Sequence, residues 1–190
     1  EITTRLVGSE MCIRDSASAL VNKRYQAYFE ERKARELANE QAKEALCERV
    51  EALDFEPIKT YADWDNMTKI IMEAQADWKK IGFASRKANN ALFTRFRAVC
   101  DRFFTLKSDF FKQMKETQAD NLARKTALAE RAEALKDSTD WRKTTDELVA
   151  LQKEWRTIGA VPKKQSDAVW RRFMDACDAF FDAKKAATGS

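Results

Sequence analysis

The chain has 190 residues, with 35 Lys and Arg against 31 Asp and Glu, and only four Gly and two Pro. Sheet proteins with many tight turns need more Gly and Pro, so this composition favours a few long helices. The sequence has no histidine, which excludes Ser-His-Asp and Cys-His catalysis and every histidine-containing metal site.

Missing patterns exclude further classes of protein. No apolar run approaches the roughly 20 residues that span a bilayer, and neither G-x-G nor G-K-[ST] occurs to form a phosphate-binding loop. The four cysteines are far apart and form no C-x-x-C pair, which argues against a zinc knuckle and against a disulfide framework. We therefore expect a cytoplasmic protein that is not an enzyme, has no cofactor and does not contact a membrane.

Residues 1–16 (EITTRLVGSEMCIRDS) differ from the rest of the chain. They lack the periodicity that follows, and they resemble translated sequencing-library sequence. We interpret 1–16 as a non-native or disordered N-terminal segment, in which Cys12 carries no function; a short native linker is the alternative. Because the chain starts at Glu1 rather than Met, we expect a fragment or a processed product.

The remaining sequence contains one unit twice. With a shift of 77 residues, 76–87 (ADWKKIGFASRK) aligns with 153–164 (KEWRTIGAVPKK). The same shift aligns Phe93 with Trp170, Phe96 with Phe173, Cys100 with Cys177, and Phe103–Phe104 with Phe180–Phe181. Further upstream the shift is 82, which aligns 45–53 with 127–135. Aligned aromatic residues at this density indicate two tandem repeats.

Three helices are expected in each repeat, over 17–116 in the first repeat and 117–190 in the second. The first helix covers roughly 18–54 in repeat one. The second is a short helix that starts at Trp64 or at Trp141. Its apolar positions alternate spacings of three and four, which keeps one stripe facing a partner helix as in a coiled coil.

Signals for the ends of this second helix flank it in both repeats. Asp63 and Asp140 precede it and are predicted N-caps, since an Asp side chain accepts the free amide hydrogens of a first turn. Gly82 and Gly159 follow it and are predicted to close it in the left-handed conformation.

A third helix is expected after each glycine. No Gly or Pro occurs between Gly82 and Gly159, so the third helix of repeat one should continue into the first helix of repeat two. This helix would cover about 85–136, roughly 50 residues and about 75 Å. The sequence therefore predicts an elongated all-α fold of tandem three-helix repeats, with coiled-coil-like antiparallel hairpins and one long helix shared between repeats.

Short motifs in the second copy recur as a recognisable set: STDW at 138–141, EWRTIGAVPKK at 154–164 and WRRFMDACDAFF at 170–181. With these motifs the repeat resembles a bacterial family of tandem helical repeats, domain of unknown function 349. The first copy departs from the pattern, because Ala84–Ser85 replaces Val-Pro and Phe93 replaces Trp. The resemblance covers about 45–187. It implies an all-α architecture and additional repeats in a longer parent chain, and it supplies no catalytic residues.

Aromatic side chains are abundant on the predicted stripes. The five tryptophans, Trp64, Trp78, Trp141, Trp155 and Trp170, are predicted core residues. A base-stacking platform is the alternative, and it would need rings that face solvent. The adjacent Phe pairs at 103–104, 110–111 and 180–181 point in different directions on a helix. They require either a helix packed on two sides or one exposed ring per pair that would bind a partner.

The cysteines at equivalent positions of the two repeats, Cys100 and Cys177, lie beside these stripes. We expect them to act as buried small hydrophobes. A nucleophilic role is the alternative, but it needs a base or an electropositive setting, and the chain has no histidine.

Basic residues are concentrated between Trp78 and Lys115, where ten Lys and Arg accompany two Asp. The candidates for a polyanion-binding surface are Lys79, Lys80, Arg86, Lys87, Arg95, Arg97, Lys163 and Lys164. Two pairs of them, at 86–87 and 163–164, lie where the glycine loop enters a helix, and helix N-termini favour anions. The alternative is a solvated face balanced by the acidic first helix.

Two functions fit these patterns. A non-catalytic scaffold or adaptor that binds protein partners along its helical faces explains the repeats and the lack of a catalytic constellation. Nucleic-acid or ribonucleoprotein binding through the basic 79–115 face and the loop cations explains the segregated charge. The second function predicts RNA or DNA binding that weakens steeply with salt.

Overall fold

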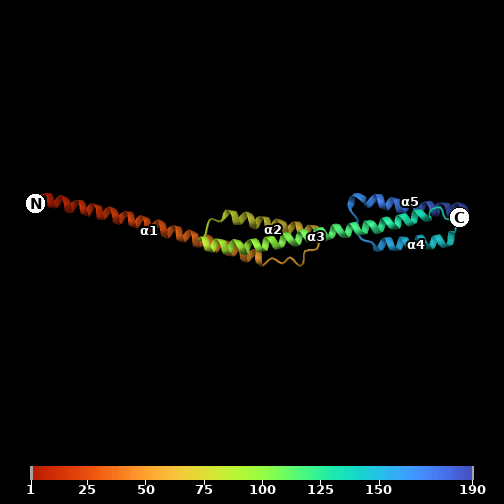
Figure 1. The fold of residues 1–190 in the computed structure, drawn as a ribbon, viewed down its shortest axis with the longest axis horizontal. Helices are drawn as coiled ribbons and strands as arrows, with labels where there is room; N and C mark the ends of the chain where they lie inside the picture. Colours follow the sequence, from red (N-terminus) through yellow and green to blue (C-terminus); the bar gives the residue numbers. More distant parts are fainter. Residues whose placement is uncertain (1, 190) are drawn as a thin grey trace. The chain divides into compact units, whose positions relative to one another are not determined.

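The computed structural model describes residues 2–189, with side chains for residues 10–189, and every regular element in this range is an α-helix (Figure 1). The helices are α1 (Ile2–Glu51), α2 (Tyr61–Lys80), α3 (Arg86–Leu135), α4 (Trp141–Thr157) and α5 (Lys163–Thr188). The chain divides into two compact units, Glu1–Leu106 and Lys107–Ser190. The predicted all-α repeat fold is confirmed, and α3 is the predicted long helix that contributes to both repeats.

The helix α1 begins earlier than the sequence led us to expect. We predicted a start near residue 18, whereas the helix already includes Ile2, so residues 2–16 belong to it. This stretch contains no proline and a single glycine, Gly8, so nothing in it breaks a helix that the following residues propagate. Side chains from residue 10 to residue 35 are all exposed, and burial begins only toward the C-terminal end of α1.

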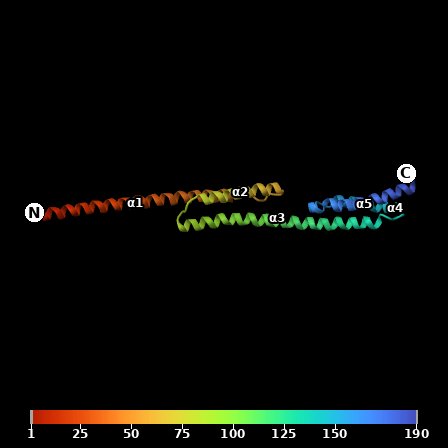
Figure 2. The same ribbon diagram turned by 90° about the horizontal axis from the view of Figure 1, so that it is seen from above.

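In the first unit, α2 lies along the end of α1 and the start of α3 (Figures 1 and 2). The indole of Trp64 on α2 packs against Phe103 on α3, with ring centroids 5.7 Å apart. Arg95 of α3 pairs with Glu51 of α1 at 2.9 Å and joins the first helix to the third. The core of this unit is formed by Leu46, Val50, Phe55, Trp64, Ile71, Phe96 and Phe103.

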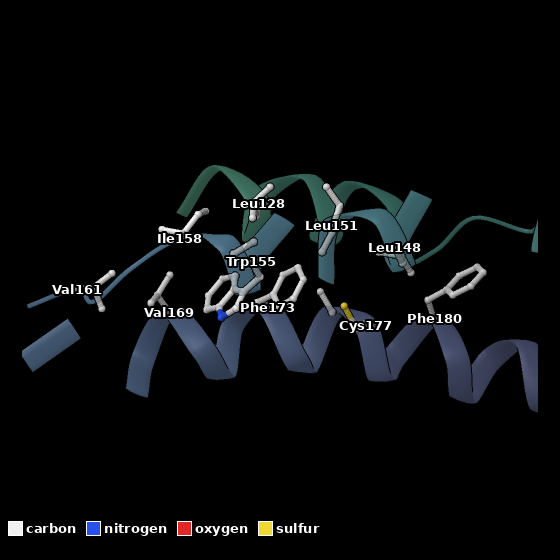
Figure 3. Packing of buried hydrophobic residues seen from close by; sticks show 13 residues of the cluster. Leu128, Leu148, Leu151, Trp155, Ile158, Val161, Val169, Phe173, Cys177 and Phe180 are labelled. Atoms are coloured by element: carbon white, nitrogen blue, oxygen red, sulfur yellow. The ribbon is translucent and has the colours of Figure 1, made fainter. Parts of the chain in front are cut away.

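The second unit repeats this arrangement with the end of α3, α4 and α5. Trp141 on α4 packs against Phe180 on α5 at the same centroid distance, 5.7 Å, and Arg172 of α5 pairs with Glu133 of α3. Figure 3 shows side chains from all three helices meeting in this core, which is formed by Leu128, Leu148, Leu151, Trp155, Val169, Phe173, Cys177 and Phe180.

The start of the second helix differs between the repeats. In the first repeat the N-cap is Thr60, whose hydroxyl accepts a hydrogen bond from the Asp63 amide at 3.1 Å, while the Asp63 carboxylate accepts one from the Thr60 amide at 3.4 Å. The prediction that Asp63 is the N-cap is therefore wrong, because Asp63 is the third residue of a capping box. In the second repeat Asp140 is the N-cap, accepting from the Lys143 amide, as predicted.

The glycines after the second helix also act differently from the prediction. Neither Gly82 nor Gly159 has a positive φ; among the residues described, Gly189 alone does. A Cβ on Gly82 would lie 2.7 Å from Nδ2 of Asn39, and one on Gly159 would lie 3.1 Å from Nδ2 of Asn121. These positions are glycine because an asparagine amide approaches the backbone closely.

Candidate binding site

Each unit has a groove between its second and third helices. In the first unit this α2–α3 groove has a volume of about 350 Å³ and is lined by Gln75, Trp78, Lys79, Phe93, Phe96, Arg97, Cys100, Asp101 and Phe104. In the second unit the α4–α5 groove has a volume of about 150 Å³ and is lined by Gln152, Trp155, Arg156, Trp170, Phe173 and Met174. With the shift of 77, every lining residue of the smaller groove aligns with a lining residue of the larger one.

A fixed aromatic stack forms the floor of both grooves. Trp78 stacks on Phe96 with ring centroids 4.7 Å apart and an interplanar angle of 18°. Trp155 stacks on Phe173 at 4.6 Å and 9° (Figure 3). Two stacked pairs with nearly the same geometry indicate that the repeat builds one rigid feature twice.

A lysine ammonium from the first helix of each repeat lies over the ring of the groove tryptophan. Lys43 Nζ lies 4.9 Å from the Trp78 ring centroid, and Lys125 Nζ lies 4.9 Å from that of Trp155. These two lysines are 82 residues apart, so they occupy equivalent positions. An ammonium over an indole is attracted by the ring electrons, so each tryptophan contacts both a lysine and a stacked phenylalanine.

Lys43 is more deeply enclosed than an ordinary lysine. Its side chain is only 4% exposed, and Nζ donates a hydrogen bond to Oδ1 of Asn89 at 2.6 Å. Burial lowers the pKa of Lys43 below its ordinary value, because desolvation disfavours the charged form.

The outer wall of each groove is a partly exposed aromatic ring. Phe93 is 45% exposed and Trp170 is 47% exposed, so the prediction that Trp170 is a core residue is wrong. On α5 the buried stripe begins at Val169 and continues through Phe173, which leaves Trp170 beside the stripe with its ring centroid 5.6 Å from that of Trp155. Trp64 and Trp155 are buried as predicted, and Trp78 and Trp141 are partly buried.

Two of the three adjacent phenylalanine pairs, at 103–104 and 180–181, combine a buried ring with a more exposed one, whereas Phe110 and Phe111 are both partly buried. Phe103 and Phe180 are fully buried, whereas Phe104 is 37% exposed and lines the α2–α3 groove, and Phe181 is partly buried. In the first repeat the structure thus supports the alternative in which one ring of a pair faces outward. The groove was not predicted from the sequence, although the alignment of Trp78, Phe93 and Phe96 with their counterparts contained the signal for it.

Three of the four cysteine side chains are buried, and the fourth, Cys12, is exposed on α1. Cys47, Cys100 and Cys177 are buried, and burial raises the pKa of each thiol. The Cys47 thiol donates to the Leu92 carbonyl at 3.3 Å. Thiols with raised pKa values remain protonated and are poor nucleophiles near neutral pH.

The eight predicted polyanion-binding residues separate into two groups. Arg95 is paired with Glu51 at 2.9 Å and with Glu44 at 3.9 Å, and Arg97 with Asp101 at 3.5 Å, so these two guanidinium groups bind carboxylates of the same repeat. All eight residues are exposed. The other six are Lys79 and Lys80 in the last turn of α2, Arg86 and Lys87 as the first residues of α3, and Lys163 and Lys164 as the first residues of α5.

The described part of the chain offers neither a membrane-spanning helix nor a metal-binding cluster. None of the helices there combines the length and apolar character needed to cross a membrane. In the same part of the chain, no group of three or more His, Cys, Asp or Glu side chains is arranged to hold a metal ion.

The repeated three-helix units and their equivalent grooves define a class of tandem helical-repeat protein. A family model described as Domain of Unknown Function (DUF349) matches residues 15–87 and 91–164. Because these matches cover more than half of the chain, the protein belongs to this family, and the predicted two copies are confirmed. No curated protein and no solved structure gives a significant match.

Proposed function

We propose that this protein is a non-catalytic helical-repeat scaffold that binds protein partners through its two grooves. The observation that carries the proposal is the repetition of one groove in both units, with aligned lining residues, a rigid Trp–Phe floor and a half-exposed aromatic wall. Tryptophan and arginine, which both line the α4–α5 groove, are enriched among the residues that contribute most to protein–protein binding.

Site-specific photo-crosslinking tests this proposal in the full chain. The crosslinking residue p-benzoylphenylalanine replaces Phe93 or Trp170, and a matched control places it at Tyr61, an exposed aromatic residue outside the groove lining. Expression in cells followed by irradiation should give discrete protein adducts from positions 93 and 170 that are absent from position 61. Identical adducts from all three positions, or adducts that ribonuclease or deoxyribonuclease removes, would contradict the scaffold function.

Nucleic-acid binding is the second candidate, and the exposed loop cations favour it. The first two residues of α3 are Arg86 and Lys87, and the first two of α5 are Lys163 and Lys164. Each repeat therefore presents two cations at a helix N-terminus. Fluorescence anisotropy with single-stranded RNA, single-stranded DNA and duplex at about 50 and 200 mM salt tests it, because contacts to several phosphates lose orders of magnitude in affinity over this range. Replacing all four cations with Glu should abolish such binding; unchanged affinity in that variant would remove these residues from the interface.

A further inference from the structure

The two grooves have aligned linings but differ in size. The larger groove is lined in addition by Cys100, Asp101 and Phe104, and the residue on the outer wall, Phe93 or Trp170, differs between the two. Of the six aligned lining positions, three hold the same residue type in both repeats (Gln75 and Gln152, Trp78 and Trp155, Phe96 and Phe173). On the outer wall, Phe93 in the first repeat is replaced by Trp170 in the second. The larger indole lies closer to the floor tryptophan, at 5.6 Å against 6.0 Å for Phe93.

We infer that the grooves hold apolar anchor side chains of a partner polypeptide, that residue 93 or 170 sets the size of each anchor, and that acidic residues flank the anchor in the partner. The α2–α3 groove takes an indole-sized anchor, and the α4–α5 groove takes one no larger than a leucine or a phenyl ring. This inference rests on the proposed scaffold function and specifies the partner's chemistry.

The volumes support this division. A cavity of about 150 Å³ holds a benzene-sized group, which matches the α4–α5 groove at about 150 Å³. The α2–α3 groove, at about 350 Å³, has room for an indole. In both floors the tryptophan contacts a stacked phenylalanine and a lysine ammonium, and these contacts restrict movement of the floor.

The charged side chains that line the grooves indicate which residues of the partner should lie beside its anchor side chain. Lys79 and Arg97 line the α2–α3 groove, and Arg156 lines the α4–α5 groove. Asp101 is the acidic residue among the lining residues of the first groove, and it is paired with Arg97 at 3.5 Å. Lys79 and Arg156 occupy equivalent positions, so both grooves present a cation at the same place and favour a carboxylate there.

These features favour a polypeptide over a nucleic acid as the occupant. A nucleic acid needs cations spaced along several phosphates, whereas the lining of the α4–α5 groove supplies one, Arg156. In the first repeat Arg95 and Arg97 each have a carboxylate beside them, Glu51 and Asp101, and these carboxylates reduce the local positive charge.

Fluorine NMR of the full chain labelled with 5-fluorotryptophan tests the inference, because the chain has five tryptophans in informative places. The Trp78 resonance reports on the α2–α3 groove, and the Trp155 and Trp170 resonances report on the α4–α5 groove. Trp64 and Trp141 line neither groove and serve as internal controls for folding. The probes are acetylated and amidated pentapeptides: Glu-Glu-Trp-Glu-Glu, Glu-Glu-Leu-Glu-Glu and Lys-Lys-Trp-Lys-Lys.

The acidic Trp peptide should shift the Trp78 resonance and leave those of Trp155 and Trp170 unchanged, while the acidic Leu peptide should shift all three. The basic Trp peptide should bind the α2–α3 groove at least about tenfold more weakly than the acidic one, because its charges oppose Lys79. Equal shifts in both grooves with the acidic Trp peptide would overturn the size rule, and equal affinity of the basic peptide would overturn the charge rule.

Matched variants separate groove size from other causes. Phe93→Trp should weaken the acidic Trp peptide in the first groove by roughly tenfold, since steric loss of this size is typical of one misfitting group. Trp170→Phe should make the Trp155 resonance respond to the acidic Trp peptide. An unaltered response in both variants overturns the role of residues 93 and 170, provided that the Trp64 and Trp141 resonances are unchanged.

The outcomes also separate this inference from the proposed function. Site-specific protein crosslinks at positions 93 and 170 without peptide selectivity would leave the scaffold function and overturn the anchor chemistry. Shifts produced by oligouridylate instead of the peptides would overturn both and favour the nucleic-acid function. A complete lack of shifts with every probe overturns the assignment of the grooves as anchor sites.

Discussion

Each repeat packs the side-chain amide of an asparagine against the loop that follows its second helix. Asn39 donates to the Phe83 carbonyl at 3.0 Å, and Asn121 donates to the Ala160 carbonyl at 2.8 Å. These two asparagines are 82 residues apart, like the lysines that cover the groove tryptophans. One turn of the first helix thus positions the loop through the asparagine and the groove floor through the lysine, so the groove depends on residues outside its lining.

The close approach of Asn39 to Gly82 gives a prediction about stability. Alanine at position 82 would place Cβ 2.7 Å from the amide nitrogen and push it away from the Phe83 carbonyl. We expect Gly82→Ala to lower the free energy of unfolding by about 1 kcal/mol, the value of one net hydrogen bond. In an Asn39→Ala background the same change should be neutral or stabilising by up to about 1 kcal/mol, because φ at Gly82 is not positive and alanine restricts the unfolded chain. Urea unfolding of the four proteins in this cycle is the measurement, and additive effects would contradict the steric explanation.

The buried thiols give a second prediction at this scale, for pH dependence. Burial raises the pKa values of Cys47, Cys100 and Cys177 in the folded protein, whereas thiols in the unfolded chain have a pKa of about 8.5. Below that pH both states keep the proton. Above it only the unfolded chain releases protons, so stability should fall as pH rises, by up to about 1.4 kcal/mol per pH unit for each thiol.

Urea unfolding between pH 7 and 9.5 measures this slope. Lys43 has the opposite effect, because its pKa is lowered in the folded protein. Between that lowered pKa and the ordinary lysine pKa of about 10.4, only the unfolded chain holds the proton, so the contribution of Lys43 to stability rises with pH. A variant with Ala at 47, 100 and 177 is the control, and Ala129 already occupies the position equivalent to Cys47. A negative slope that persists in this variant would show that other groups cause it.

At the scale of the helices, the sequence was a good guide to which segments fold and a poorer guide to how they end. The 3/4 spacing and the lack of Gly or Pro between residues 82 and 159 were sufficient to predict α2, α3 and α4, because both are local properties of the chain. The prediction for Asp63 was wrong because Asp suits both the cap and the third position of a capping box, and Thr60, three residues earlier, provides the cap.

Features that depend on contacts between helices escaped prediction. The reason for Gly82 lies in a side chain 43 residues away, Asn39. The pairing of Arg95 with Glu51 required the register between α1 and α3, and a charge count assigned Arg95 to a free basic face. Of the adjacent residues Val169 and Trp170, Val169 points into the core and Trp170 is exposed. A spacing of three and four does not show which of two adjacent residues is the buried one.

The capping box supports a prediction for α2. Thr60→Ala removes the hydroxyl that accepts the Asp63 amide at 3.1 Å, and loss of such a cap costs about 1 kcal/mol. Thr60→Ser keeps the acceptor and should cost less than half as much. Thermal unfolding followed by circular dichroism measures both, and an equal loss in the two variants would mean that the Thr60 methyl group, not the cap, supports the helix.

At the scale of the whole chain, two compact units each have a complete aromatic core, and α3 supplies one helix to both. Phe103 in the first unit and Phe180 in the second are fully buried and contact Trp64 and Trp141 at the same centroid distance of 5.7 Å. In repeat proteins the stability is approximately a sum of local terms. Loss of one core should therefore unfold its own repeat before the other.

Phe103→Ala and Phe180→Ala test this with a matched pair. Each removes a fully buried ring and should destabilise its own unit by about 3–5 kcal/mol. Amide hydrogen exchange should then show loss of protection in α4, α5 and the end of α3 for Phe180→Ala, with α2 still protected, and the reverse pattern for Phe103→Ala. Because α3 is continuous between the units, the amides near Leu106 and Lys107 should show intermediate protection in both variants. Uniform loss of protection throughout the chain in either variant would mean that α3 couples the two cores into one cooperative unit.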